Sequence, residues 1–204
     1  MPAEYLVYGK RRTGSVPIEA ALTLLGAPYQ VVERGPGEDH PAGSAMGQVP
    51  VVQLPSGELM TESAAILIHI ADTHPRAKLS PAIDDPRRPA FLRWMAFVSA
   101  QIYALVWVRD DPMRLAADEA HAALIMQRTA ERRLFCWRTM DAELDPGRFL
   151  LGDDLTVLDL YVAVTSTFGP GRAAFAEAAP SMAEVMKRVD THPKLQSLWH
   201  DRLF

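Results

Sequence analysis

Ser15 lies at the start of a predicted helix, where a nucleophilic anion could be bound. Ser15 opens a helix after a loop, and Pro17 lies in the first turn of that helix. A serine there is a good N-cap, because its hydroxyl can accept a hydrogen bond from a free backbone N–H. The same helix end favours anions, so the position would also stabilise a thiolate. From the local sequence alone we favour the cap.

A second helix start combines a carboxylate, hydroxyls and free N–H groups in Thr61-Glu62-Ser63. Thr61 or Ser63 can cap this helix, and Glu62 suits the positive end of its dipole. These roles need no ligand. The same set of groups could also hold the amine and the carboxylate of an amino acid, so the sequence leaves both interpretations open.

A proline interrupts an otherwise β-prone run, Gln48-Val49-Pro50-Val51-Val52. Proline lacks the N–H that a central strand donates, so an edge position or a bulge would account for Pro50. A cis Val49–Pro50 bond is the alternative, but cis bonds make up only about 5–6% of X–Pro bonds in folded proteins. Spacing alone therefore does not predict one.

Other residues carry structural signals only. Thr156 and Asp159 have the spacing of a capping box, with aspartate in the usual glutamate position. Cys136 is the only cysteine, and we expect it to be a thiol in the helical core. Gly9 to Ser15 has the glycine spacing of a P-loop, but serine stands where a P-loop has the phosphate-binding lysine.

Several catalytic motifs are absent from the sequence. It contains no C-x-x-C, which excludes thioredoxin-type dithiol exchange, and no G-x-S-x-G, H-E-x-x-H or G-x-G-x-x-G. His69 and His74 lack the spacing that would place two ligands on one helix face. We therefore expect neither a metal site nor a bound cofactor.

Composition excludes several classes of protein. The chain has 204 residues, a formal charge of −4, 49% hydrophobic and 23% charged residues, and one cysteine. At roughly 100–200 residues per domain, this length allows one large domain or two small ones. The mild negative charge argues against a nucleic-acid partner, and a single cysteine excludes a disulfide framework.

The longest uncharged stretch runs from Trp94 to Val108 and falls short of the ~20 apolar residues of a membrane span. We therefore expect a buried helix there, and no membrane partner. The first ten residues, MPAEYLVYGK, contain no long apolar run, so no secretory signal is expected. A cytoplasmic location is the default.

The elements that must position these residues change character near residue 80. Before it, β-prone runs and amphipathic helices alternate as βαβ followed by ββα, which predicts a four-stranded mixed sheet of thioredoxin-like arrangement. The expected strands are 5–8, 29–33, 49–54 and 58–60, and the expected helices are 15–25, ending at Gly26, and 63–72.

The remainder of the chain shows helical patterns without convincing strands. The expected helices are 90–109, 113–144, 157–167 and 182–189. We therefore predict an α/β domain at 1–78, a linker at 79–88 and an all-helical bundle domain at 89–204.

Three stretches together resemble a cytosolic glutathione transferase of the bacterial kind. They are GSVPIEAALTLLGAPYQVV, GQVPVVQLPSGELMTESAAILIHIAD and LLGDDLTVLDLYVAV, in that order along the chain. The resemblance implies that Pro50 is a cis-proline, so that Val49 presents its backbone N–H and C=O to the cysteinyl part of glutathione. It also implies that Glu62 and Ser63 bind the γ-glutamyl amine and carboxylate.

The resemblance further implies a thiol-facing group at the start of the first helix. Ser15 matches the place where many relatives keep a serine or cysteine. The Lys10-Arg11-Arg12-Thr13 loop departs from the small or proline residues of many relatives. Thr13 or Arg12 could therefore replace or assist Ser15.

Three further implications concern the remaining parts of the ligands. The glycine carboxylate of glutathione would meet Gln48 or His40. A small apolar electrophile would lie between the domains beside Tyr103, Trp107 and Arg109, although these residues could equally be helix core or subunit contacts. Aromatic faces suit such a substrate.

The implied activity is conjugation of the glutathione thiolate to an electrophile, by a homodimer that uses glutathione as co-substrate and no cofactor. Fold does not fix reaction. Two alternatives therefore remain, namely a glutathione-binding or regulatory protein without catalysis and a glutathione-dependent disulfide reductase or isomerase.

Overall fold

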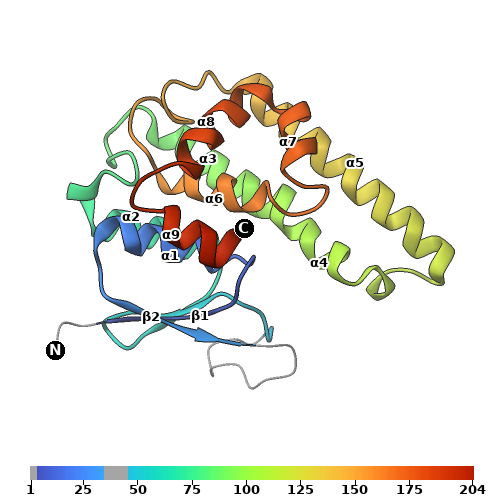
Figure 1. The fold of residues 1–204 in the computed structure, drawn as a ribbon, viewed down its shortest axis with the longest axis horizontal. Coiled ribbons are helices and arrows are strands. Elements are labelled where there is room, and N and C mark those ends of the chain that lie inside the picture. Colours follow the sequence, from blue (N-terminus) through green and yellow to red (C-terminus); the bar gives the residue numbers. More distant parts are fainter. Residues whose placement is uncertain (1–3, 35–45) are drawn as a thin grey trace.

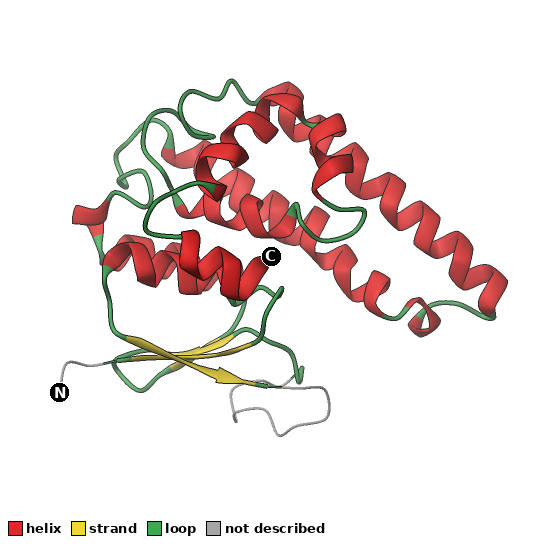
Figure 2. Ribbon diagram, in the orientation of Figure 1, coloured by secondary structure: helices red, strands yellow, loops and turns green. Residues whose placement is uncertain are grey.

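The structure, a computed structural model, describes residues 4–34 and 46–204. Its strands form one mixed sheet in the order β2-β1-β3-β4 (Figure 2). β1 (Tyr5–Gly9) pairs in parallel with β2 (Tyr29–Glu33) and antiparallel with β3 (Val51–Gln53), which pairs antiparallel with β4 (Leu59–Met60). The predicted thioredoxin-like sheet is confirmed.

Two helices form a layer between the sheet and the helical half of the chain (Figure 1). α1 (Val16–Leu25) crosses over between the parallel strands, and α2 (Ser63–Thr73) follows the β3–β4 hairpin. Both contact α6 (Val157–Thr165), all nine residues of which are buried. Gly26 ends α1 with φ +64°, a left-handed conformation that glycine adopts without steric cost, as predicted.

The second half is helical in the described part of the chain. Its remaining elements are α3 (Arg88–Phe97), the π-helical segment η2 (Val98–Tyr103), α4 (Ala104–Asp110), α5 (Glu119–Glu143), α7 (Arg172–Ala178), α8 (Pro180–Asp190), α9 (Gln196–Leu198) and the π-helical turn η4 (Trp199–Leu203). Short 3₁₀ turns occupy Pro75–Ala77 and Pro112–Arg114. The domain boundaries proposed at residues 78 and 88 stay a prediction.

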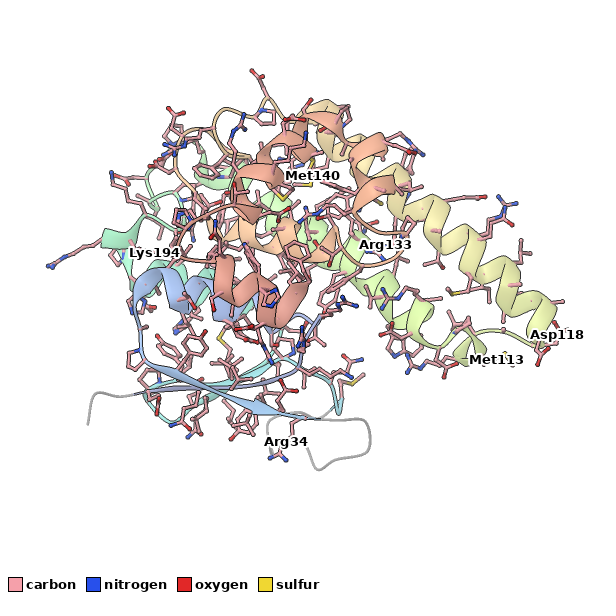
Figure 3. The ribbon with its side chains drawn as sticks, in the orientation of Figure 1. Arg34, Met113, Asp118, Arg133, Met140 and Lys194 are labelled. Atoms are coloured by element: carbon pink, nitrogen blue, oxygen red, sulfur yellow. The ribbon has the colours of Figure 1, made fainter. Side chains whose placement is uncertain are left out.

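The predicted helix start at Met113 was wrong. The N–H of His121 donates to the Asp118 carboxylate at 2.8 Å, so Asp118 caps α5 and the helix begins at Glu119. Met113 belongs to the preceding 3₁₀ turn, and Figure 3 places both Met113 and Asp118 at the end of the α4–α5 hairpin remote from the sheet. The helical patterns in the sequence did not predict α7, α9 or η4.

The apolar stretch around residues 94–108 is not a fully buried helix. Trp94, Met95 and Val98 are buried, whereas Leu92 and Trp107 are 41% and 42% exposed. The continuous helical stretch of 23 residues from Arg88 to Asp110 has the length and mean hydropathy of a membrane-crossing helix. Core helices of soluble proteins meet the same criteria, so this finding alone assigns no membrane. The prediction of a buried helix was wrong because the apolar side chains of a helix can also face solvent, as those of Leu92 and Trp107 do.

Two local predictions are confirmed. The Asp159 carboxylate accepts from the backbone N–H of Thr156 at 2.8 Å, and the Thr156 side chain accepts from the backbone N–H of Asp159, which completes the capping box of α6. Asp159 is fully buried, and desolvation raises the pKa of its carboxyl from 3.8 to about 6. Cys136 is buried in α5, as expected of a core thiol.

Candidate functional site

The strand register brings three chain segments together at one end of the strands. Tyr8 pairs with Val51, and Val52 pairs with Met60. Three segments therefore come together at this end of the strands: the loop that follows β1, the residues before β3 and the residues after β4. These segments contain the hydroxyls, the proline and the carboxylate that the sequence singled out.

The Val49–Pro50 peptide bond is cis. Pro50 is buried and stands immediately before β3, so no strand N–H is required of it. The expected edge strand or bulge was therefore wrong, because β3 lies between β1 and β4 and starts after the proline. Gln48 is exposed at the same turn, whereas His40 lies outside the described residues.

The start of α2 has an unusual backbone and no side-chain cap. Glu62 has φ +66° and ψ +99°, and its side chain is exposed. A residue with a Cβ in such a conformation costs on the order of 1–3 kcal/mol and persists where surrounding structure holds it. Neither Thr61 nor Ser63 caps α2, contrary to expectation, because the Ser63 hydroxyl instead bonds that of Tyr161 at 2.9 Å.

The loop after β1 holds its two hydroxyls in an internal network. Ser15 is fully buried in a helical conformation, and its hydroxyl donates to the Glu19 carboxylate at 2.9 Å. Ser15 occupies the predicted N-cap position of α1, but its hydroxyl makes no capping bond, so the predicted capping role of the hydroxyl was wrong. The Thr13 hydroxyl donates to the Lys10 carbonyl at 2.8 Å and lies 3.1 Å from the Ser15 oxygen. Thr13 is half-buried and is the more accessible of the two.

Arg12 points away from this pair of hydroxyls. Its guanidinium donates to the backbone oxygens of Leu203 and Phe204 at 3.1 and 2.9 Å. Its backbone has φ +56°, the left-handed region. The structure therefore places Arg12 against the C-terminal turn rather than in reach of a thiol beside Thr13, which weighs against the predicted thiol-assisting role.

Two tyrosines from the helical half join the site segments. The N–H of Gly14 donates to the Tyr103 hydroxyl at 2.9 Å, and the Tyr103 ring packs edge-to-face on Tyr161 at 6.1 Å. Burial raises the pKa of both phenols, so both are protonated at neutral pH. Tyr161 was not among the predicted site residues, although its hydroxyl within the apolar run 157–164 was a signal in the sequence.

The predicted electrophile residues are only partly brought together. Tyr103 packs on Phe168 with ring centroids 5.6 Å apart, and the Arg109 guanidinium lies 5.9 Å from the centre of the same ring. Trp107 is 42% exposed and is covered by the guanidinium of Arg114 at 4.8 Å. Tyr103 and Arg109 therefore both lie against the buried Phe168 ring, whereas Trp107 lies against Arg114.

Two other features of the described residues lie outside these segments. No group of three or more histidine, cysteine, aspartate or glutamate side chains within residues 4–34 and 46–204 is arranged to hold a metal ion. A cavity of about 520 Å³ lies along the connection between α2 and α3, lined by Asp72, Lys78, Arg88 and other residues of both charge signs. None of its lining residues belongs to the three site segments.

Comparisons with known proteins agree with this geometry. Residues 15–73 match the family model of the glutathione S-transferase N-terminal domain. A glutathione transferase homologue from Sulfitobacter, solved with bound glutathione, superimposes with a TM-score of 0.84 at 20% identity over 99% of this chain and all of that one. A sphingomonad glutathione S-transferase in complex with glutathione has a TM-score of 0.79 at 22% identity, over 97% and 98% of the two chains.

Curated relatives extend the likeness along the sequence. GstA, a glutathione S-transferase of Escherichia coli O157:H7, is 23% identical over 78% of this chain and 76% of its own. YncG, an uncharacterised GST-like protein of Escherichia coli K12, is 30% identical over 94% of this chain and 95% of its own. With that identity over nearly its whole length, the chain belongs to the glutathione S-transferase family.

Proposed function

We propose that this protein binds glutathione and transfers its thiolate to a small apolar electrophile. One observation carries the proposal: the turn before β3, the left-handed Glu62 and the start of α2 meet beside the loop after β1. The two solved relatives that share the fold and hold glutathione support the choice of ligand.

Glutathione would be held mainly by backbone groups and by the end of α2. Val49 offers a backbone N–H and C=O just before β3. The cysteinyl residue of glutathione can pair with these two groups in the way that an extended peptide pairs with a strand. The free N–H groups at the start of α2 suit the γ-glutamyl carboxylate, and the exposed Glu62 carboxylate suits its amine. Ser63 and Gln48 complete the proposed contacts, and His40 remains a candidate for the glycine carboxylate.

Thr13 is the better-placed hydroxyl for the sulfur. A free thiol has a pKa of about 8.5, and lowering it by one unit takes about 1.4 kcal/mol of preferential stabilisation of the thiolate. A hydroxyl donor near a helix N-terminus can supply this amount. Ser15 is fully buried and donates to Glu19, whereas Thr13 is half-exposed and needs only to release the Lys10 carbonyl.

The electrophile would lie beside Tyr103 and Arg109, where the Tyr103 ring, backed by the buried Phe168 ring, suits a nonpolar substrate. We further propose a homodimer that covers the apolar face marked by Leu92 and Trp107. The cytoplasmic location stays a prediction.

One observation favours a second candidate, a glutathione-binding protein without catalysis. Both hydroxyls already donate to groups of the protein, Thr13 to the Lys10 carbonyl within the loop and Ser15 to the Glu19 carboxylate of α1. In that case glutathione would bind and its thiol pKa would stay near its value in water.

Calorimetric titration with reduced glutathione, followed by a panel of aryl halides, epoxides and enones, separates these functions. Saturable binding with turnover of at least one electrophile supports the transferase. Binding without turnover supports the second candidate, and turnover of disulfides or cis-enediones alone points to a reductase or isomerase. Absence of binding to reduced glutathione, oxidised glutathione and an S-alkyl analogue refutes all of them.

A further inference from the structure

The C-terminal turn lies directly against the loop that carries Thr13. The C-terminal turn η4, next to the C label in Figure 1, touches α1 through the ion pair of Arg202 with Glu19. The N–H of Arg12 donates to the carbonyl of Arg202 at 3.0 Å, and the Arg12 guanidinium donates to the backbone oxygens of Leu203 and Phe204. The loop and the turn are thus joined by main-chain as well as side-chain bonds.

An ion pair continues this connection into α1. The Arg202 guanidinium binds Glu19 through two bonds, Nε to Oε2 at 2.8 Å and Nη2 to Oε1 at 3.1 Å, and it also pairs with Glu33. The Glu19 side chain is 1% exposed and that of Arg202 is 14% exposed. A carboxylate this deeply buried needs a partner, and Arg202 provides it.

The buried carboxylate in turn orients the loop hydroxyls. Glu19 Oε1 accepts from the Ser15 hydroxyl at 2.9 Å, and the Ser15 oxygen lies 3.1 Å from that of Thr13. A continuous series of polar contacts therefore runs from Arg202 through Glu19 and Ser15 to Thr13. The Ser15 hydroxyl donates its one proton to Glu19 and the Thr13 hydroxyl donates to Lys10, so the bond that joins Ser15 to Thr13 comes from the Ser15 backbone N–H, which donates to the Thr13 hydroxyl oxygen at 3.4 Å. Displacement of Arg202 would let Ser15 shift and would weaken this hold on Thr13.

The loop is also held in a backbone conformation that it would not keep by itself. Arg12 has φ +56°, and a residue with a Cβ adopts this left-handed region only where its surroundings hold it there. The bonds that hold Arg12 come from Arg202, Leu203 and Phe204. The turn therefore stabilises the strained residue immediately before Thr13.

We infer that Arg202 is a positioning residue for the thiol-binding loop: acting through Glu19 and Ser15, it holds Thr13 where a glutathione sulfur would accept its hydrogen bond. The inference rests on the proposed function. The simpler alternative is that this ion pair only fastens the two halves of the chain together. The alternatives differ in what happens to catalysis when the pair is neutralised.

The test compares two double variants that each remove an ion pair without leaving a buried charge unpaired. Glu19→Gln with Arg202→Gln removes the pair in question. Arg172→Gln with Asp190→Asn removes a matched pair in the helical half, joined at 2.8 Å, with side chains 25% and 24% exposed. Both are assayed with glutathione and an accepted electrophile at a temperature where circular dichroism shows them fully folded.

For the first variant we expect kcat to fall about tenfold to 100-fold, because small displacements of a catalytic group have large effects on rate. The KM for glutathione should change by less than about threefold, because the binding groups at Val49 and α2 are untouched. The control variant should keep both constants, and Arg202→Lys, which retains one bond to Glu19, should recover most of kcat. Equal values of kcat in the two double variants would overturn the inference.

Amide hydrogen exchange of residues 13–16, 18 and 19 provides a readout that does not depend on turnover. We expect these amides to exchange about tenfold faster in the Glu19→Gln/Arg202→Gln variant than in the control, because local opening sets their exchange. Unchanged protection would overturn the inference. A native protein that conjugates no electrophile would instead refute the proposed transferase, so the two failures are seen in different measurements.

Discussion

Replacement of Ser15 by alanine tests whether its hydroxyl serves the fold or the thiol. The hydroxyl is fully buried and donates to the Glu19 carboxylate at 2.9 Å. Hydrogen bonds to charged groups contribute about 1.5–3 kcal/mol. Glu19 keeps its two bonds to Arg202 in the variant, so the carboxylate is not left unpaired. We therefore expect the free energy of unfolding to fall by about 1.5 kcal/mol, at the lower end of that range.

Two further variants serve as comparisons for the loss of stability and of turnover expected in Ser15→Ala. Ser80→Ala removes a serine–carboxylate bond of the same length, 2.9 Å to Asp72, at an exposed site, and should cost less than about 1 kcal/mol. Thr13→Val removes the proposed thiol-facing hydroxyl from a half-buried position. It should lower kcat about tenfold or more, and by more than Ser15→Ala does.

Urea unfolding followed by circular dichroism gives the free energies, with the slope checked to be constant among the variants. Steady-state kinetics at saturating glutathione gives kcat. If Ser15→Ala left stability within about 0.5 kcal/mol of the native value, a typical surface substitution, and abolished turnover, the buried orientation of Ser15 would be refuted. Thr13 would then lose its proposed role.

Three further predictions concern ligand affinity, pH dependence and assembly. Glu62→Gln should raise the dissociation constant of glutathione about tenfold in calorimetry, because it removes a charge partner for the γ-glutamyl amine; an unchanged constant would exclude Glu62 from the site. Folding raises the pKa of Asp159 to about 6, so the folded protein binds this proton more tightly than the unfolded chain does, and stability should fall as pH rises from about 4 to about 6. The two-unit difference corresponds to about 3 kcal/mol, which Asp159→Asn should remove from the pH profile; equal profiles would contradict the assignment. Leu92→Glu should shift the protein from dimer to monomer in sedimentation equilibrium, because a charge would lie in the proposed interface; an unaltered mass would place the interface elsewhere.

Local signals in the sequence predicted most of the fold. The capping box of Thr156 and Asp159 was readable because both partners lie within one helical turn. The sheet followed from alternating strand and helix patterns, and the end of α1 followed from Gly26. The start of α5 was misplaced because the helical pattern extends back to Met113, whereas the helix itself begins only after its cap, Asp118.

The site was predicted less completely, because its side chains are oriented by partners that lie far away in the sequence. The sequence showed a hydroxyl at residue 15 beside a helix start, and both the cap and the thiol-facing role were reasonable for it. Its direction is decided by Glu19, whose own partner, Arg202, lies 183 residues further along the chain. Ser63 is similar, since its hydroxyl bonds Tyr161, 98 residues away.

Site residues whose geometry is fixed locally can be assigned from the family with fewer errors than side chains that distant partners orient. In the proposed site, Val49 acts through its backbone groups and Glu62 through an exposed carboxylate, so the local sequence is enough to locate them. A hydroxyl acts through the direction of one O–H bond, and a single buried acceptor can turn it away from a ligand. Glu19 is such an acceptor for Ser15. The position of Ser15 therefore matches the family while its proton is committed to the fold, and Thr13 is left as the group to test.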